Sequence, residues 1–195
     1  MINSELGHVK TLEEFNSEIR RQQEEAHGKG YCDIHDAIKK YMEECDSYME
    51  LGTHQGGTAS IAMLTNPNFV QLVDIDFTKY RKFLAPIARK YCKENDINLI
   101  LKEMDSRTFP SMSTASVDML VIDSVHKAPF MKQELTMHGA NVNKYILAHD
   151  TSRLLGREDD QLFRELEAWG KRNRWVVIER GINYVGYTVL KKKGA

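Results

Sequence analysis

The chain has 195 residues, which matches one domain of ordinary size and suffices to bury a core without cross-links. Its 27 Lys and Arg residues nearly balance 28 Asp and Glu residues, and the formal net charge of -1 gives nucleic acid no broad positive surface. A hydrophobic fraction of 42% excludes a disordered polar chain.

The first 46 residues are predicted to form a helical cap. Thr11 and Glu14 have the spacing of a capping box, and apolar residues recur at helical spacing after them. Gly28 is expected to end this helix. A second amphipathic helix is expected over about Asp33–Cys45, where one apolar stripe would cover a sheet edge or a pocket.

From residue 47 onward, short apolar runs alternate with amphipathic helical stretches. The expected strands are Ser47–Leu51, Phe69–Ile75, Leu99–Met104, Met119–Ile122 and Tyr145–Ala148. The expected helices are Thr58–Leu64, Thr78–Asn95, Phe130–Met137 and Asp159–Trp169. This alternation is typical of an α/β fold with a doubly wound, mostly parallel, Rossmann-like sheet. Residues 47–195 are therefore predicted to form the ligand-binding domain, with the helical cap as an extension of one compact unit.

The end of the chain departs from this alternation. Arg174–Glu179 and Tyr184–Lys191 are both strand-like, and only four residues separate them. Because a parallel crossover needs a dozen or more residues, these two strands are predicted to pair as an antiparallel hairpin. This ending differs from the usual nicotinamide-binding sheet, whose strands run parallel throughout.

A glycine-rich turn, Gly52–Gly57 with the sequence GTHQGG, follows the first expected strand. Glycines here allow a tight turn, and the missing side chain of Gly52 is expected to let a ligand approach ahead of a helix N-terminus. The order G-x-x-x-G-G differs from the dinucleotide fingerprint G-x-G-x-x-G, so a tight pyrophosphate cradle is not expected. A purely structural turn would explain the glycines equally well.

Acidic residues end the next two expected strands. Asp74 lies 22 residues after Gly52, close to the offset of about 20 at which a carboxylate reaches a ribose hydroxyl. Asp105 ends the third strand at the same carboxyl edge, where open α/β sheets bind ligands. Each acid alone is explained equally well as a helix N-cap, whereas together they favour a nucleoside site.

The segments ELGTHQGGT, VDID, MDS, VIDSVH and AHDT, in this order within residues 48–190, resemble the class I S-adenosylmethionine-dependent methyltransferases. The resemblance implies that Glu50 and Gly52 form the methionine end of the cofactor site and that Asp74 binds the ribose hydroxyls. It places Asp105 and Ser106 beside the adenine. The full set of implied cofactor-binding residues is Glu50, Gly52, Thr53, Gly56, Asp74, Asp105, Ser106 and Asp123.

VIDSVH and AHDT are similar to elements of a branch that includes small-molecule O-methyltransferases and proteins of the cephalosporin hydroxylase type. Several members hold Mg²⁺ at these strand ends, which implies Asp123 and Asp150 as metal ligands. His149 departs from an all-oxygen ligand set, and imidazole suits Mg²⁺ poorly. The alternative is a histidine base, because an ordinary imidazole pKa of about 6.5 suits proton transfer near neutrality. The expected catalytic residues are His126, His149 and Asp123.

We therefore predict an S-adenosylmethionine-dependent methyltransferase that acts on a hydroxyl of a small molecule, such as a sugar or secondary metabolite. The near-neutral charge, and the absence of an Asn-Pro-Pro-Tyr-like tetrad after the fourth strand, disfavour a nucleic-acid acceptor. Two alternatives stay open. A noncatalytic nucleoside-cofactor-binding module is favoured by Ser124-Val125, which replaces a small acidic pair, and a nicotinamide-dependent oxidoreductase would share the parallel sheet. The oligomeric state, a homo-oligomer included, and the acceptor stay open.

Other features predict location rather than chemistry. No apolar stretch approaches the roughly 20 residues of a membrane span, and no basic-then-apolar leader opens the chain, so we expect a soluble, cytoplasmic protein without a membrane partner.

The three cysteines have no Cys-x-x-Cys spacing and are interpreted as buried fillers: Cys32, Cys45 and Cys92. The remaining histidines are interpreted as surface or capping residues: His8, His27, His35 and His138.

Overall fold

The computed structural model describes residues 6, 8–108, 116–152 and 160–195. These residues form one seven-stranded sheet in the order β3-β2-β1-β4-β5-β7-β6. The strands are β1 (Ser47–Leu51), β2 (Phe69–Asp74), β3 (Asn98–Glu103), β4 (Val117–Ile122), β5 (Val142–His149), β6 (Trp175–Gly181) and β7 (Tyr187–Lys192). β1 to β5 pair in parallel, whereas β7 runs antiparallel to both β5 and β6. The mostly parallel sheet and the terminal antiparallel hairpin confirm the predicted fold class.

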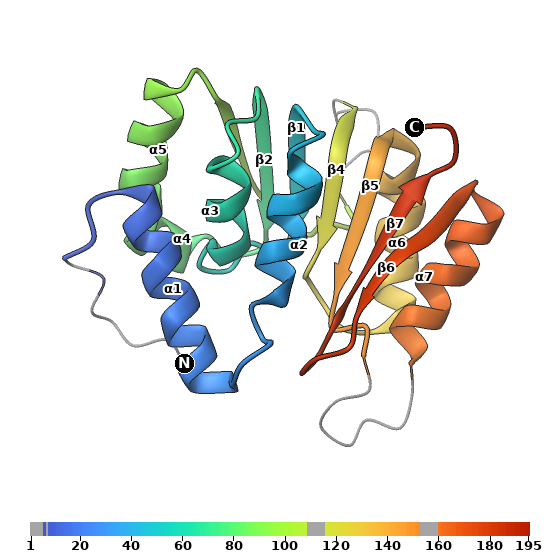
Figure 1. The fold of residues 1–195 in the computed structure, drawn as a ribbon. Helices are drawn as coiled ribbons and strands as arrows, with labels where there is room; N and C mark the ends of the chain where they lie inside the picture. Colours follow the sequence, from blue (N-terminus) through green and yellow to red (C-terminus); the bar gives the residue numbers. More distant parts are fainter. Residues whose placement is uncertain (1–5, 7, 109–115, 153–159) are drawn as a thin grey trace.

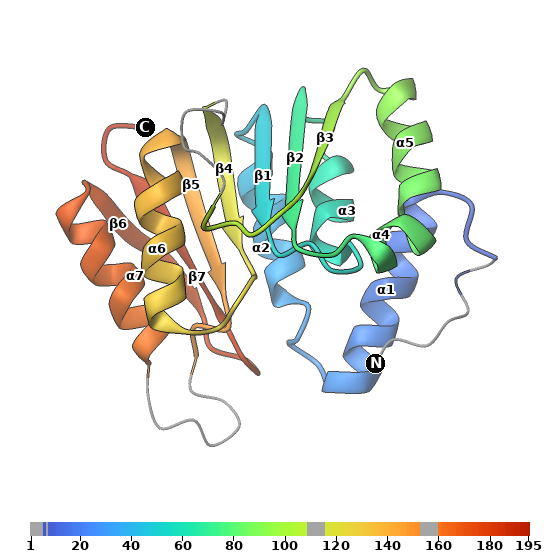
Figure 2. The same cartoon turned by 180° about the vertical axis from the view of Figure 1, so that it is seen from behind.

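Helices cover both faces of the sheet and give the molecule three layers (Figures 1 and 2). One face packs against α1 to α5, and the other packs against α6 and α7. The helices are α1 (Leu12–His27), α2 (Asp33–Met42), α3 (Gly57–Met63), α4 (Thr78–Phe83), α5 (Ala85–Glu94), α6 (Ala128–His138) and α7 (Gln161–Arg172), with a short 3-10 turn at Gly139–Asn141.

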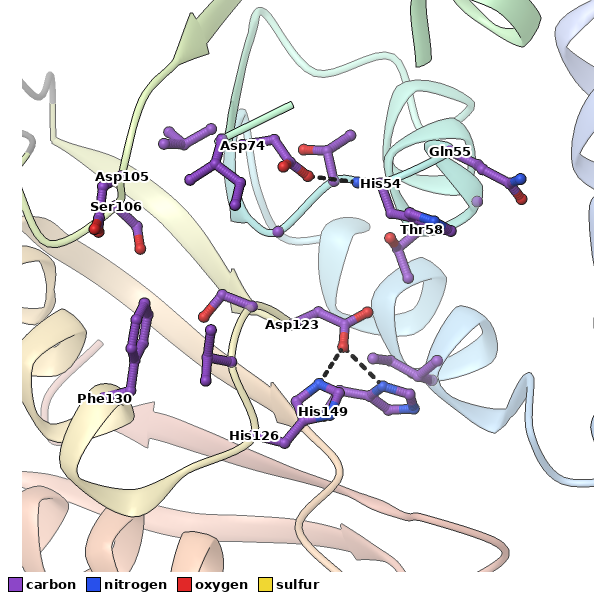
Figure 3. Close-up of a pocket in the computed structure, with 18 of the residues that line it drawn as sticks. His54, Gln55, Thr58, Asp74, Asp105, Ser106, Asp123, His126, Phe130 and His149 are labelled. Atoms are coloured by element: carbon purple, nitrogen blue, oxygen red, sulfur yellow. Dashed lines mark hydrogen bonds and ion pairs between the residues drawn. The ribbon is translucent and has the colours of Figure 1, made fainter. Parts of the chain in front are cut away.

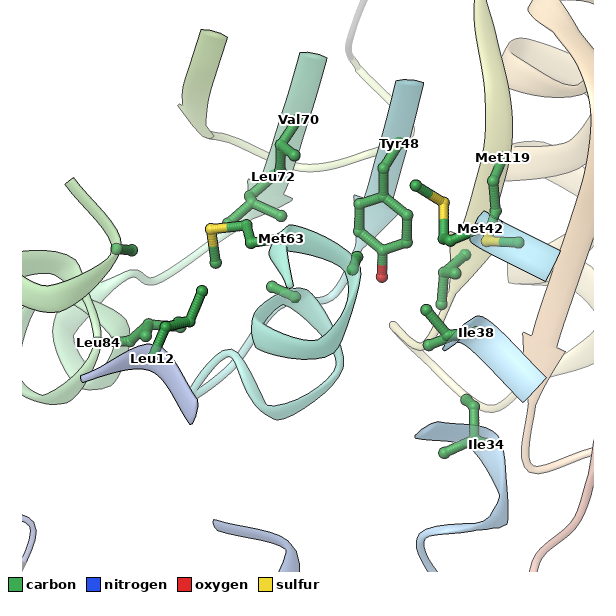
Figure 4. Close-up of a cluster of buried hydrophobic side chains, with 14 of the residues drawn as sticks. Leu12, Ile34, Ile38, Met42, Tyr48, Met63, Val70, Leu72, Leu84 and Met119 are labelled. Atoms are coloured by element: carbon green, nitrogen blue, oxygen red, sulfur yellow. The ribbon is translucent and has the colours of Figure 1, made fainter. Parts of the chain in front are cut away.

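The buried strands place alternate residues in two separate hydrophobic clusters. In β1, Tyr48 belongs to the cluster under α1 to α5, and the next residue, Met49, belongs to the cluster under α6 and α7. Figure 4 shows Tyr48 among the side chains of the first cluster. This alternation follows from the two-residue period of a strand, and it explains why these strands read as continuous apolar runs.

The N-terminal cap shares the first of these clusters with the sheet. The predicted capping box is present, because the Thr11 hydroxyl accepts a hydrogen bond from the Glu14 amide and the Glu14 carboxylate accepts one from the Thr11 amide. Arg20 of α1 binds both carboxylate oxygens of Asp36 in α2, at 2.6 and 2.7 Å. The two cap helices therefore form one unit on the sheet.

Several predicted elements differ from the structure in their bounds. The single helix expected over Thr78–Asn95 is two helices, α4 and α5, which meet at Leu84. Pro86 lies in the first turn of α5, where it has no N–H to continue the hydrogen bonding of α4. The second cap helix ends at Met42 rather than Cys45. Asp159, the expected start of the last helix, lies outside the described residues.

The described residues also bear on the expectations about membrane spans and cysteines. No helix among these residues is long and apolar enough to cross a lipid bilayer. The three cysteines, which are buried and unpaired, agree with the filler interpretation.

Candidate active site

One pocket of about 540 Å³ lies at the carboxyl ends of the central strands. Its wall includes the loops after β1, β2, β3 and β4, the last residue of β5, and side chains of the N-terminal cap. In Figure 3, Asp105 and Phe130 lie at one end, Gln55 and Thr58 lie at the other, and Asp123 lies between them. Six segments that are distant in sequence therefore meet around one volume.

The glycine turn shapes the wall, although not in the expected way. Gly52 has φ of 89°, and a Cβ on it would lie 2.7 Å from Cα of Ser124 and closer still to the Asp123 carbonyl. The close neighbour of Gly52 is thus the backbone after β4. Gly52 also lines the pocket, and its expected role in letting a ligand approach stays a prediction. Gly56, with φ of 87°, precedes α3 and packs against Leu84 behind the pocket wall.

Glu50 lies beneath the pocket rather than on its surface. Its side chain is fully buried, and the Thr58 hydroxyl donates a hydrogen bond to its Oε1. Burial raises the pKa of Glu50 to about 8, so the carboxyl is largely protonated at neutral pH. Thr53 and Thr58, in contrast, line the pocket. Glu50 is thus linked to the pocket lining by its contact with Thr58.

Asp74 lines the pocket at the end of β2, where it was predicted to lie. Its Oδ2 accepts a hydrogen bond of 2.7 Å from the backbone amide of His54, and its Oδ1 accepts one of 3.0 Å from Asp76. The first contact joins the loop after β1 to the end of β2 (Figure 3). The carboxylate is therefore held in one orientation before any ligand binds.

The loop after β3 brings the next two predicted residues to the pocket. Asp105 forms an ion pair with Arg107 at 2.7 Å. The Ser106 hydroxyl donates a hydrogen bond of 2.5 Å to Glu134 of α6, and the Ser124 hydroxyl donates one of 2.7 Å to the same oxygen. Burial raises the pKa of Glu134 to about 7. This buried acid, which the sequence analysis missed, fixes two hydroxyls that line the pocket.

The four residues of VIDSVH and AHDT with ionisable side chains form one group, here called the Asp–His cluster: Asp123, His126, His149 and Asp150. One oxygen, Asp123 Oδ1, lies 3.2 Å from His126 Nε2 and 2.9 Å from His149 Nδ1. The other ring nitrogen of His126 contacts Asp150. The structure thus brings all the predicted catalytic and metal-ligating residues together.

The charges within the cluster alter the expected proton chemistry. Although burial alone would lower the pKa of His126, the carboxylates of Asp123 and Asp150 raise it to about 10. Burial also opposes the charge on His149, but Asp123 outweighs it and raises the pKa of that imidazole. His126 is therefore an imidazolium at neutral pH, in place of the ordinary imidazole on which the general-base hypothesis relied. That role stays a prediction.

Two of the remaining histidines are buried, which corrects their interpretation as surface or capping residues. His35 of α2 lines the pocket at 2% exposure, and burial lowers its pKa to about 4, so it is neutral. His138 of α6 is fully buried, and its Nε2 lies 2.7 Å from the carbonyl oxygen of Ser106. Tyr31 is a further wall residue that the sequence analysis missed; its ring packs edge-on to His149, with 5.9 Å between the ring centroids.

No model of a protein family matches the chain, and no curated protein matches its sequence. The fold, however, is similar to that of the O-methyltransferase TomG from Streptomyces achromogenes in complex with SAM, with a TM-score of 0.55 and 16% identity over 83% of this chain and 78% of that chain. The seven-stranded sheet with its helices matches the Rossmann-like fold of methyltransferase structures.

Two further solved structures support the same assignment of the fold. Ribosomal protein L11 methylase from Lactobacillus delbrueckii subsp. bulgaricus has a TM-score of 0.57 and 12% identity over 80% of this chain and 78% of that chain. TYW2 from M. jannaschii in complex with AdoMet has a TM-score of 0.54 and 15% identity over 84% of this chain and 75% of that chain. At such identities the similarity concerns the fold alone.

The pocket residues fit S-adenosylmethionine, the compound bound in two of these solved structures. Near the glycine turn, Thr53 Oγ1, Gln55 Oε1 and His35 Nδ1 are buried and have no hydrogen-bond partner among the described residues. Each such atom costs about 1–3 kcal/mol when unpaired, so a ligand with a polar amino-acid end would relieve that cost. Asp74 supplies a carboxylate that can accept from ribose hydroxyls.

Mg²⁺ does not fit the Asp–His cluster. Mg²⁺ prefers an octahedron of oxygen ligands, whereas two of the four groups in the cluster are imidazoles. The cluster therefore gives no support to the Mg²⁺ site that the resemblance implies at Asp123 and Asp150.

Proposed function

We propose that the protein is an S-adenosylmethionine-dependent methyltransferase that acts on a hydroxyl of a small molecule. The observation that carries this proposal is that one pocket is lined both by Asp74 and Asp105, two of the predicted nucleoside-binding residues, and by three of the four residues of the Asp–His cluster. A cofactor held by Asp74 and the glycine turn would lie in the same volume as Asp123. Cofactor and acceptor groups would thus be held side by side, as a transfer reaction requires.

The proposed roles follow from the positions of the residues. S-adenosylmethionine supplies a methyl group bonded to a positively charged sulfur. The acceptor oxygen forms a bond to the methyl carbon as the carbon–sulfur bond breaks, and the hydroxyl proton must leave. Asp123, His126 and His149 all line the pocket, and we assign to them the orientation of the hydroxyl and the stabilisation of its oxygen as the proton leaves.

A small acceptor is favoured over a macromolecule by the wall of the pocket. The N-terminal cap contributes Gln23, Tyr31, Ile34 and His35 to that wall, so the cap covers part of the volume beside the cluster. The net charge of -1 offers no general attraction for nucleic acid. Several hydroxyl-bearing metabolites would satisfy these conditions, and the site does not choose among them.

The alternative is a cofactor-binding module without catalysis. It is favoured by one observation: both ring nitrogens of His126 already contact carboxylates, so this imidazole is engaged before any acceptor arrives. Such a module would bind the cofactor and turn nothing over.

Calorimetry followed by a turnover screen separates these functions. We expect S-adenosylhomocysteine to bind with a dissociation constant in the micromolar range and NAD⁺ not to bind. Methyl-labelled S-adenosylmethionine should then label at least one member of a panel of sugars, phenols and other hydroxylated compounds. Absence of S-adenosylhomocysteine binding by the folded protein would overturn the proposal, and binding without any turnover would favour the module.

A further inference from the structure

The mismatch between Mg²⁺ and the Asp–His cluster points to a different ion. We propose that the cluster binds a divalent transition-metal cation of borderline softness, of which Zn²⁺ is the type, through Asp123, His126 and His149. Asp150 would not bind the ion and would instead orient His126. Imidazole suits Zn²⁺ and its neighbours in the series, and two imidazoles with one carboxylate form a recurrent catalytic ligand set.

Interatomic distances support the three ligands. Asp123 Oδ1 lies 3.2 Å from His126 Nε2 and 2.9 Å from His149 Nδ1. Ligand atoms bonded to Zn²⁺ at about 2.0–2.1 Å are separated from one another by roughly 2.9–3.4 Å, depending on the coordination angle. Both contacts of Asp123 therefore already have the spacing of neighbouring ligands around one ion.

Asp150 differs from the other three residues in its position. It contacts Nδ1 of His126, the ring nitrogen opposite the one that faces Asp123. A carboxylate behind a metal-binding imidazole fixes the ring and increases its basicity. The Asp150 carboxylate stays 4.0 Å from His149 Nδ1, farther than either contact of Asp123.

The three proposed ligands also share an open side. Asp123, His126 and His149 line the 540 Å³ pocket, whereas Asp150 is not part of its wall. An ion held by three protein groups would keep coordination positions free toward the pocket, as catalytic sites do. Its use as a Lewis acid for an acceptor hydroxyl rests on the proposed function; binding of the ion does not.

Titration calorimetry with the metal alone tests the site on the full chain. We expect one equivalent of Zn²⁺ to bind and Mg²⁺ at millimolar concentration to give no heat of binding. Asp123→Asn and His149→Asn should each weaken Zn²⁺ binding at least 100-fold, and Asp150→Asn should weaken it 10- to 100-fold, as loss of an orienting group does. His8→Asn, which removes an exposed histidine outside the cluster, is the matched control and should bind Zn²⁺ like the wild type.

The outcomes separate this inference from the proposed function. Unchanged Zn²⁺ binding in folded Asp123→Asn, or equal affinity for Mg²⁺ and Zn²⁺, overturns the site. Equal losses in Asp150→Asn and Asp123→Asn overturn the orienting role of Asp150. If a variant fails to fold, the visible absorption spectrum of the wild type mixed with Co²⁺ tests the site instead. A spectrum identical to that of hydrated Co²⁺ in water would mean that no imidazole binds the ion, and it would overturn the site. Calorimetry with S-adenosylhomocysteine on the same preparations reports the cofactor site independently.

Discussion

Gly52 and Asp123 follow β1 and β4, two neighbouring strands, and the Asp123 backbone occupies the space that a side chain on Gly52 would need. Gly52 also has a positive φ of 89°. Any substitution there must therefore strain the backbone and displace the residue that begins the Asp–His cluster.

We expect Gly52→Ala to lower the free energy of unfolding for two reasons: alanine at residue 52 would have an unfavourable positive φ, and its Cβ would collide with the Asp123 backbone. A positive φ alone costs a non-glycine residue about 1–2 kcal/mol. Gly28→Ala is the matched control, because Gly28 has φ of 96° and nothing within 4 Å of its Cβ position. Urea unfolding of both variants measures the difference, and equal losses would contradict the close packing of Gly52 on Asp123.

Asp74 should contribute charge as well as orientation to cofactor binding. Asp74→Asn keeps an oxygen that can accept from the His54 amide, but it removes the charge. We expect S-adenosylhomocysteine binding to weaken by about 1.5–3 kcal/mol, the value of a hydrogen bond to a charged group. Asp76→Asn, which alters an exposed carboxylate of the same turn, should leave affinity unchanged in calorimetry. An unaltered affinity in Asp74→Asn would remove the ribose assignment.

Glu134 should make the protein less stable as the pH rises. Burial raises its pKa from 4.5 to about 7, so the folded state keeps a proton that the unfolded state has already lost. Its contribution to stability is complete below pH 4.5 and is lost as the pH rises through 7, by on the order of 3 kcal/mol. The free energy of unfolding, measured with urea at pH 5 and pH 7.5, should fall less with pH in Glu134→Gln than in the wild type. If it falls equally in both proteins, Glu134 does not contribute to the pH dependence.

His35 should act in the opposite direction. Burial lowers its pKa from 6.5 to about 4, so the unfolded state takes up a proton first as the pH falls. Its contribution is present above pH 6.5 and is lost toward pH 4, by on the order of 3 kcal/mol. His35→Gln should therefore be the less acid-sensitive protein in thermal unfolding between pH 7 and pH 4.5. The pH dependences of stability that Glu134 and His35 produce have opposite signs. Because they partly cancel in the wild type, each effect is visible only by comparison with its own variant.

The sequence predicted the sheet because its central strands are buried on both faces and therefore appear as apolar runs. It predicted the Asp–His cluster because residues that end neighbouring parallel strands must meet at one edge. Glu134 and His138 were missed, although a signal was present: with Met131 and Leu135 they occupy the i, i+3, i+4, i+7 positions of a buried helical stripe. Polar residues at such positions need buried partners, and here those partners come from Ser106 and Ser124.

Other features could not be predicted from one sequence. The shift in the pKa of His126 depends on two carboxylates that approach it from separate strand ends, so no local pattern reveals it. The contribution of Tyr31 to the pocket depends on how the cap folds back over the sheet. Both are consequences of tertiary contact.

The contacts between the N-terminal cap and the terminal hairpin bear on the order in which the molecule can be completed during synthesis. Tyr31 packs against Tyr184 with 5.2 Å between ring centroids, and Asp33 accepts a hydrogen bond of 2.8 Å from Asn183. The Tyr41 hydroxyl donates to Glu179. These partners leave the ribosome about 150 residues apart, so a nascent chain can form the central strands well before the cap has all its contacts. The part of the pocket wall that the cap supplies can then be held by all its contacts only after the terminal hairpin has formed.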